Sequence, residues 1–104
     1  MYDRFVVRYG PDDVRTVGVA RGESLYMALE RNGLPIRTRC RGSTLCGLCW
    51  VRVPDPPATL AAIQPDERAL LDREAPNEPT ARLACRLVLP IGVQRVDVEV
   101  PAYP

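Results

Sequence analysis

Four cysteines, three of them crowded into ten residues, constrain this chain more than any other feature. The first three stand in Cys40-Arg41-Gly42-Ser43-Thr44-Leu45-Cys46-Gly47-Leu48-Cys49, and Cys85 follows much later in the chain. Glycines within the cluster permit positive φ and lack a Cβ, so backbone N–H groups can turn toward a small object. An anionic core with bridging sulfides needs such donors. The spacing therefore predicts a loop wrapped around an inorganic group, with one more ligand supplied by a remote segment.

The chain contains no histidine. A Ser–His or Cys–His nucleophile is therefore impossible within it, and the commonest general base is absent as well. The two-histidine ligation of a Rieske centre is excluded for the same reason. We predict no catalytic residues, and the cysteines are the candidate metal ligands.

Three other uses of the cysteines compete with this interpretation. Two disulfides would suit a secreted protein, but the N-terminal residues lack the basic-then-apolar layout of a signal peptide. A structural zinc site usually has two C-x₂₋₄-C pairs, whereas only Cys46 and Cys49 form such a pair here. A thioredoxin-type redox pair requires a helix starting at the motif, and Trp50 to Val53 favour a strand instead.

The length of 104 residues predicts a single domain over residues 1–104. The net charge of +1 favours neither a nucleic acid nor a membrane surface as partner. No stretch approaches the roughly 20 apolar residues of a membrane span. We expect a cytoplasmic protein, and nothing in the sequence indicates an oligomer, so we expect a monomer.

The hydrophobic pattern predicts strands and helices in a definite order. Strands are expected over 2–9 and 14–19, and Ser24 should cap a helix over 25–31 that ends near Gly33. A short strand is expected over 50–53. A second helix should begin at Pro65, with Ala69, Leu70 and Leu71 on its apolar side.

Two more strands are expected near the C-terminal end. The first should cover 83–89 around Cys85. The second is indicated by Val96, Val98 and Val100, which alternate with acidic residues. This order fits an α+β fold with a helix packed on one face of a mixed sheet.

The cysteine loop resembles that of the plant-type and adrenodoxin-type ferredoxins. The plant-type pattern is C-x₄-C-x₂-C followed by a distant cysteine, and this chain has five residues in the first gap, as adrenodoxin-like members do. Arg82-Leu83-Ala84-Cys85 is similar to the segment around the family's fourth ligand. Asp66-Glu67-Arg68-Ala69-Leu70-Leu71-Asp72 is similar to the acidic helix that precedes it. Trp50 and Arg86, each following a cysteine, depart from many relatives.

The resemblance implies a β-grasp fold, a ubiquitin-like roll with one main helix and a cluster-binding loop. It implies one [2Fe–2S] cluster held by Cys40, Cys46, Cys49 and Cys85. Cys40 and Cys46 would bind the outer iron, where the added electron mostly resides, and Cys49 and Cys85 the inner iron. The protein would then be a one-electron carrier and not an enzyme.

The resemblance also implies transient partners: a ferredoxin reductase, and an electron-accepting enzyme such as a cytochrome P450. The acids of 66–72 could form one docking surface, and the rim formed by Arg37, Arg39 and Arg41 another. Local ion pairs could instead occupy those acids, and the arginines could simply be hydrated. Alternative roles are the reactivation of a ring-cleaving dioxygenase and the supply of electrons for iron–sulfur assembly.

Overall fold

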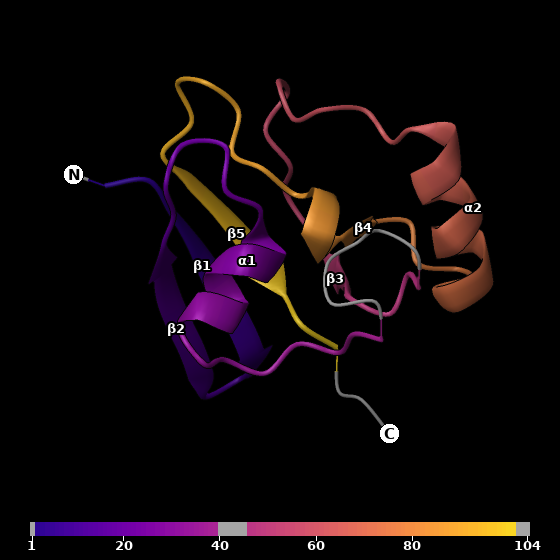
Figure 1. Cartoon of the computed structure of the whole chain (residues 1–104), viewed down its shortest axis with the longest axis horizontal. Helices are drawn as coiled ribbons and strands as arrows, with labels where there is room; N and C mark the ends of the chain where they lie inside the picture. The colour runs from indigo at the N-terminus through magenta and orange to yellow at the C-terminus, as the bar shows by residue number, and fades with distance from the viewer. Residues whose placement is uncertain (1, 40–45, 102–104) are drawn as a thin grey trace.

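A five-stranded mixed sheet and two α-helices make up most of the structure, a computed structural model that describes residues 2–39 and 46–101 (Figure 1). The strands are β1 (Arg4–Gly10), β2 (Asp13–Gly18), β3 (Trp50–Arg52), β4 (Ala81–Leu83) and β5 (Arg95–Glu99). Their order in the sheet is β2-β1-β5-β3-β4. β1 and β5 run parallel, and the other neighbours are antiparallel. The predicted α+β fold with a mixed sheet is confirmed.

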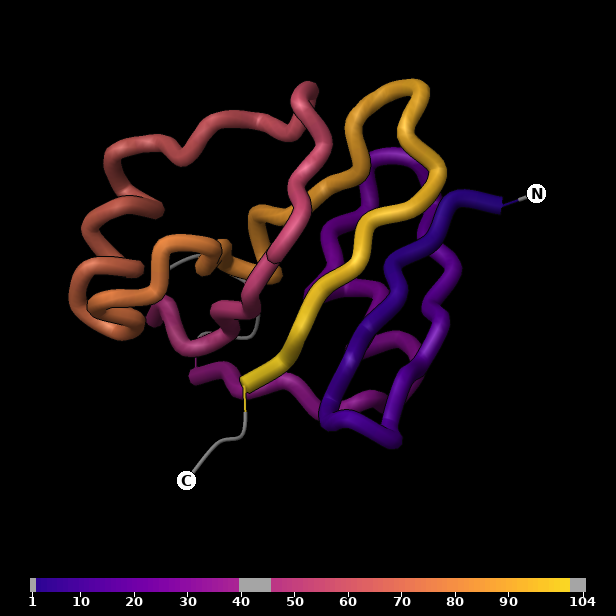
Figure 2. The backbone as a smooth tube through the Cα atoms, turned by 180° about the vertical axis from the view of Figure 1, so that it is seen from behind, coloured from indigo at the N-terminus to yellow at the C-terminus, as the bar shows by residue number. Residues whose placement is uncertain are grey.

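The central strands follow the period-two pattern of the sequence. Phe5 lies opposite Val96 and Val7 opposite Val98 in the parallel pair, and all four side chains are buried. Figure 2 shows β5 running between β1 and β3. Alternate residues of a strand point to opposite faces, so one face of this pair supplies the core. The strand predicted from Val96 and Val98 is therefore confirmed.

Helix α1 (Leu25–Arg31) packs against one face of the sheet (Figure 1). The Ser24 hydroxyl accepts a hydrogen bond from the Met27 N–H at 3.2 Å, which is the predicted N-cap. Leu25, Tyr26, Ala28 and Leu29 are buried. Gly33 has a φ of 68°, the left-handed conformation expected just beyond a helix end.

Helix α2 (Pro65–Glu74) lies apart from α1, beside β4 (Figure 1). It begins where predicted, but its buried face is different. Leu71 is buried as expected, whereas Ala69 is exposed and Glu67 is buried. Positions 67 and 71 lie one helical turn apart, so they share the face that meets β4. None of the described helices is long and apolar enough to cross a bilayer.

The carboxylate of Glu67 attaches α2 to β4. It accepts hydrogen bonds from Arg82 Nε at 2.9 Å and Arg82 Nη2 at 3.3 Å, and from the Leu83 N–H at 3.0 Å. The Glu67 side chain is 2% exposed and that of Arg82 is 10% exposed. A buried charge is tolerated only when it is paired and hydrogen-bonded. This contact therefore fixes the position of α2 against the strand that leads to Cys85.

The prediction of a strand over 83–89 was wrong. The β4 ladder ends at Leu83, and Ala84–Arg86 form a short 3₁₀ helix, η1, closed by a hydrogen bond from the Leu87 N–H to the Ala84 carbonyl. The apolar run reflects burial of Leu83, Ala84 and Leu87 rather than strand structure. A short apolar run does not by itself distinguish a strand from another buried segment.

We predict that Glu67→Gln lowers the free energy of unfolding by about 3 kcal/mol or more, because it leaves the buried Arg82 guanidinium without its counter-charge. Asp72→Asn on the same helix is the matched control, since the Asp72–Arg68 pair is exposed. That change should cost less than about 1 kcal/mol. Anaerobic urea unfolding followed by circular dichroism measures both. Equal losses in the two variants would contradict a structural role for the buried pair.

Candidate functional site

Two backbone N–H groups converge on the sulfur of Cys46. The Arg39 N–H donates to Cys46 Sγ at 3.3 Å, and the Leu48 N–H donates to the same sulfur at 3.4 Å. Cys46 is partly exposed. Hydrogen bonds to a ligating thiolate stabilise its negative charge. This sulfur is therefore prepared to act as an anionic ligand close to the surface.

Helix α2 supports the backbone of the cysteine loop. Gly47 has a φ of 69°, and a Cβ built there would lie 3.0 Å from Leu70 Cβ and 3.1 Å from Glu74 Cγ. Arg73 Nη2 also donates to the Cys46 carbonyl at 3.1 Å. Only glycine suits both the left-handed backbone and this close approach. The backbone of the loop at Gly47 therefore packs directly against α2, with no side chain between them.

Cys49 and the segment of Cys85 meet at the β3–β4 pair. Trp50 and Leu83 are partners in the ladder, and the Ala84 N–H donates to the Cys49 carbonyl at 3.1 Å. Cys49 is buried, with 1% of its surface exposed, and Cys85 in η1 is partly exposed. Sheet pairing thus brings together two cysteine segments that are remote in sequence.

The structure places three of the four predicted ligands. Cys40, together with Arg41 and Leu45, lies outside the described residues. Cys46, Cys49 and Cys85 form no disulfide with one another. Within 2–39 and 46–101, no group of three or more Cys, Asp, Glu or His side chains could hold a metal ion. A [2Fe–2S] core needs no such trio, because each of its two irons takes two protein ligands.

Arginines lie on several sides of the site. Arg37 and Arg39 are exposed in the segment that precedes the loop. Arg86, next to Cys85, forms an ion pair with Asp66 at the start of α2. The hydrogen bond from Arg86 holds the pKa of the Asp66 carboxyl below its usual value. Charge near Cys85 is therefore partly balanced within the chain.

The remaining acids of α2 also have arginine partners. Asp72 Oδ1 lies 3.4 Å from Arg68 Nη1, and Glu74 Oε2 lies 2.8 Å from Arg73 Nε. Beyond the helix, the bidentate guanidinium of Arg52 lowers the pKa of the Glu78 carboxyl through its hydrogen bonds. The local ion pairs considered as an alternative to an acidic docking face are thus present.

Trp50, which directly follows Cys49, packs against the core and is partly buried. The Arg52 guanidinium lies 5.4 Å from the centre of its ring, a cation–π contact. The Glu67–Arg82 pair and the N–H donors on Cys46 Sγ were missed. For Glu67 a signal existed, since it precedes Leu71 by four positions and so shares its face.

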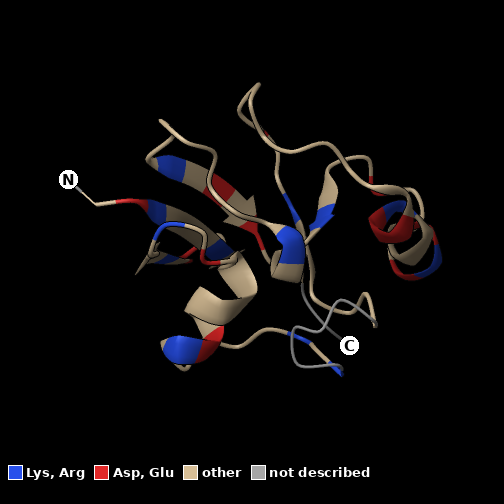
Figure 3. Ribbon diagram, turned by 45° about the horizontal axis from the view of Figure 1, so that its top comes forward, with Lys and Arg blue, Asp and Glu red and all other residues tan. Residues whose placement is uncertain are grey.

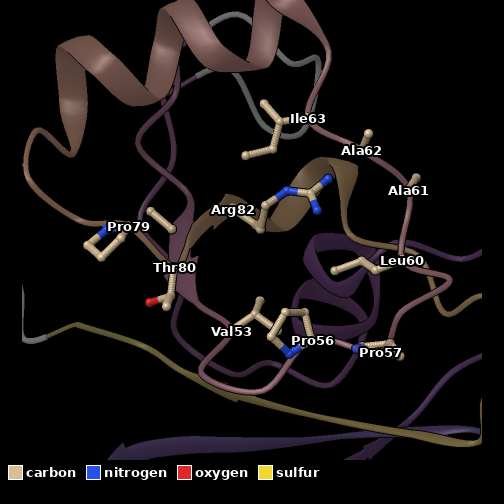
Figure 4. Close-up of a pocket in the computed structure, with 11 residues that line it drawn as sticks. Val53, Pro56, Pro57, Leu60, Ala61, Ala62, Ile63, Pro79, Thr80 and Arg82 are labelled. Carbon is tan, nitrogen blue, oxygen red and sulfur yellow. The ribbon is translucent and has the colours of Figure 1, made fainter.

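An apolar pocket of about 310 Å³ lies on the other side of Arg82, between β4 and the loop before α2 (Figure 4). It is lined by Val53, Pro56, Pro57, Leu60, Ala61, Ala62, Ile63, Pro79, Thr80, Ala81 and Arg82. Arg82 is the one charged residue among them, and its Nε and Nη2 are bonded to Glu67. None of these residues is a cysteine, so the pocket adds no ligand to the metal site.

Comparison with known proteins agrees with this chemistry. The family model described as "2Fe-2S iron-sulfur cluster binding domain" matches residues 11–89. The chain is 32% identical over 82 residues to a 2Fe-2S ferredoxin of Pseudomonas aeruginosa, covering 79% of this chain and 71% of that protein.

Solved structures confirm the β-grasp arrangement. The ferredoxin of Rhodopseudomonas palustris HaA2 superposes with a TM-score of 0.84 at 25% identity, covering 94% of this chain and 95% of that one. A reduced putidaredoxin variant from Pseudomonas putida gives 0.81 at 28% identity, with 95% and 96% covered. Putidaredoxin in a covalent complex with putidaredoxin reductase gives 0.85 at 27%, with 97% and 100% covered.

The site residues fit the group that these relatives carry, since a sulfur with two backbone donors and a glycine cradle suit an anionic iron–sulfur core. The chain therefore belongs to the [2Fe–2S] ferredoxins, proteins that carry electrons on one such cluster and are not themselves enzymes.

Proposed function

We propose that Cys40, Cys46, Cys49 and Cys85 hold the cluster, and that the chain passes single electrons from a ferredoxin reductase to an oxygenase such as a cytochrome P450, or to another metabolic redox enzyme. The observation that carries the ligand assignment is the pair of N–H donors on Cys46 Sγ. A neutral thiol is only a weak acceptor, so two N–H donors on one sulfur favour a thiolate ligand at this position.

The cluster supplies one-electron redox chemistry when it is bound. The residues of the chain provide its surroundings. Cys49 lies in the core, where water is excluded, whereas Cys46 lies nearer the surface. This asymmetry supports Cys49 as a ligand of the inner iron and Cys46 as a ligand of the outer iron. We assign Cys85 to the inner iron and Cys40 to the outer iron from the resemblance alone.

The putidaredoxin–putidaredoxin reductase complex supports a reductase as one partner. Carriers of this kind form small, short-lived interfaces. A cytochrome P450 is the acceptor that we propose from the resemblance to adrenodoxin-type proteins. Ring-cleaving dioxygenase reactivation and iron–sulfur assembly stay alternatives, and the expected cytoplasmic location, single domain and monomeric state stay predictions.

We predict that anaerobic reconstitution yields a reduced protein with an S = 1/2 EPR signal, and that a ferredoxin reductase with its own reductant generates it. Cys85→Ser should lose most of this signal and unfold more easily, because binding of the cluster by Cys85 would link two remote segments of the chain. A visible spectrum without iron–sulfur absorption in the wild-type protein would refute the cluster assignment. An unchanged EPR signal and unchanged stability in Cys85→Ser would refute the assignment of Cys85 as a ligand.

Gly47→Ala should shorten the lifetime of the cluster, because a Cβ at this position collides with Leu70 and Glu74. Gly22→Ala is the matched control, since Gly22 has a φ of 83° but open space around it. Both variants bear the left-handed strain of about 1–2 kcal/mol, but only Gly47→Ala disturbs the loop. Bleaching of visible absorbance in the presence of a chelator measures the lifetime. Equal rates for the two variants would count against the support of the loop by α2.

The reduction potential should lie above the figure of about −400 mV for plant-type ferredoxins, because N–H donors on a ligand sulfur stabilise the reduced form. Arg37 and Arg39 are exposed, so salt screens their contribution. A redox titration at low and at high salt separates the two causes: the backbone contribution stays and the arginine contribution fades. A potential well below about −400 mV would contradict the argument.

A further inference from the structure

The apolar pocket beside β4 contains one charged side chain, and part of that side chain has no partner. Arg82 Nε and Nη2 donate to the Glu67 carboxylate, but among the residues that the structure describes Arg82 Nη1 has no hydrogen-bond acceptor. The Arg82 side chain is only 10% exposed. A guanidinium has five N–H donors, two of them on Nη1. Buried donors therefore remain available at the wall of the pocket.

The guanidinium of Arg82 points into the pocket. Figure 4 shows it extending from β4 into the space that Leu60 enters from the opposite side. The segment 56–64, which supplies that side, contains no charged residue. Figure 3 shows this uncharged loop running to α2, where acids and arginines are interleaved. Leaving a buried donor without an acceptor costs free energy, so the pocket favours a molecule that brings an acceptor.

The charge of the pocket favours a neutral molecule. Glu67 already balances the charge of Arg82 through two hydrogen bonds. A carboxylate would add a negative charge without a counter-charge to an apolar site, and an ammonium would add a positive charge beside a guanidinium. Each would lose hydration that the site does not replace. A carbonyl oxygen accepts an N–H hydrogen bond and adds no net charge.

The size and walls of the pocket favour a small molecule with an apolar body. Its volume of about 310 Å³ lies at the lower end of the range for ligand pockets, about 300–1,000 Å³. Most of its wall consists of proline, alanine and branched aliphatic side chains. An ordered water needs two to four polar partners, and these side chains provide few of them. An apolar body would instead be removed from water on binding, which is favourable.

We propose that this pocket binds a small, uncharged, mainly apolar molecule through one carbonyl oxygen, which accepts a hydrogen bond from Arg82 Nη1. The apolar part of the molecule would contact Leu60, Ile63 and Val53, which line the pocket. Glu67 keeps both of its hydrogen bonds to Arg82, so binding leaves the contact between α2 and β4 intact. The inference requires no electron transfer and goes beyond the proposed function.

Three probes that share a six-membered ring test the chemistry: cyclohexanone, cyclohexene and cyclohexanecarboxylate. Saturation-transfer difference NMR titrations with the oxidised holoprotein give a Kd for each. Cyclohexanone should bind about fivefold more tightly than cyclohexene, the contribution of one net hydrogen bond, and more tightly than the carboxylate. Arg82→Lys keeps a positive charge beside Glu67 but lacks Nη1. This variant should lose the preference for the ketone over cyclohexene.

A second pair of variants tests the location. Leu60→Trp fills the pocket without changing Arg82 or Glu67, so it should abolish binding of cyclohexanone. Leu89→Trp is the matched control, because Leu89 is also a partly buried leucine packed against the core but does not line this pocket. It should bind cyclohexanone as the wild-type protein does. Circular dichroism checks that each variant is folded.

Each outcome supports or overturns the inference. Equal binding of cyclohexanone and cyclohexene, tighter binding of the carboxylate, or no binding of any probe overturns the proposed chemistry. Unchanged binding in Leu60→Trp, or an equal loss in Leu89→Trp, overturns the location. If Arg82→Lys does not fold, the ratio of the two Kd values in the wild-type protein decides. The EPR signal of the reduced protein is measured separately, so a failure of the electron-carrier function is distinguishable from a failure of binding.

Discussion

The buried carboxylate of Glu67 is the contact on which the arrangement of this site depends. It neutralises Arg82 and accepts the Leu83 N–H, so it joins α2 to the strand that ends two residues before Cys85. A neighbouring side of the same helix meets Gly47, between two other cysteines. One helix therefore contacts both segments that carry the proposed ligands. A buried ion pair adds little net stability compared with apolar packing, but its geometry is demanding. The Glu67–Arg82 pair therefore mainly fixes the position of α2 against β4.

The sulfurs of Cys46 and Cys49, which we propose as ligands, lie in different environments within one short stretch of chain. Cys46 lies where the loop turns. The N–H groups of Arg39 and Leu48 can donate to its sulfur because neither is used in a helix or a sheet. Cys49, three residues later, has entered the core just before β3. Burial disfavours charge and backbone donors favour it. The loop thus gives the proposed metal centre one buried side, at Cys49, and one side near the surface, at Cys46.

Much of this fold could be predicted from the sequence because its signals are local. Ser24 and Gly33 bound α1, and the alternation at Val96 and Val98 marks β5. The cysteine spacing identified the chemistry. Prediction failed where a tertiary contact overrides the local pattern. Glu67 looked like a solvated acid because its counter-charge lies fifteen positions away, and Cys85 sits in a turn because the ladder stops at Leu83.

The ion pairs of α2 also involve tertiary contacts that the local sequence does not reveal. They change what can be inferred from the near-zero net charge of the chain. A near-neutral chain could hold separated acidic and basic patches or could cancel its charges pairwise, and only the fold distinguishes these cases. Here Arg86 reaches Asp66 from η1, so cancellation is local. Surface pairs contribute little to stability, yet they determine how far the field of the helix extends. For a carrier that must leave its partner after every electron, a short-ranged field favours release.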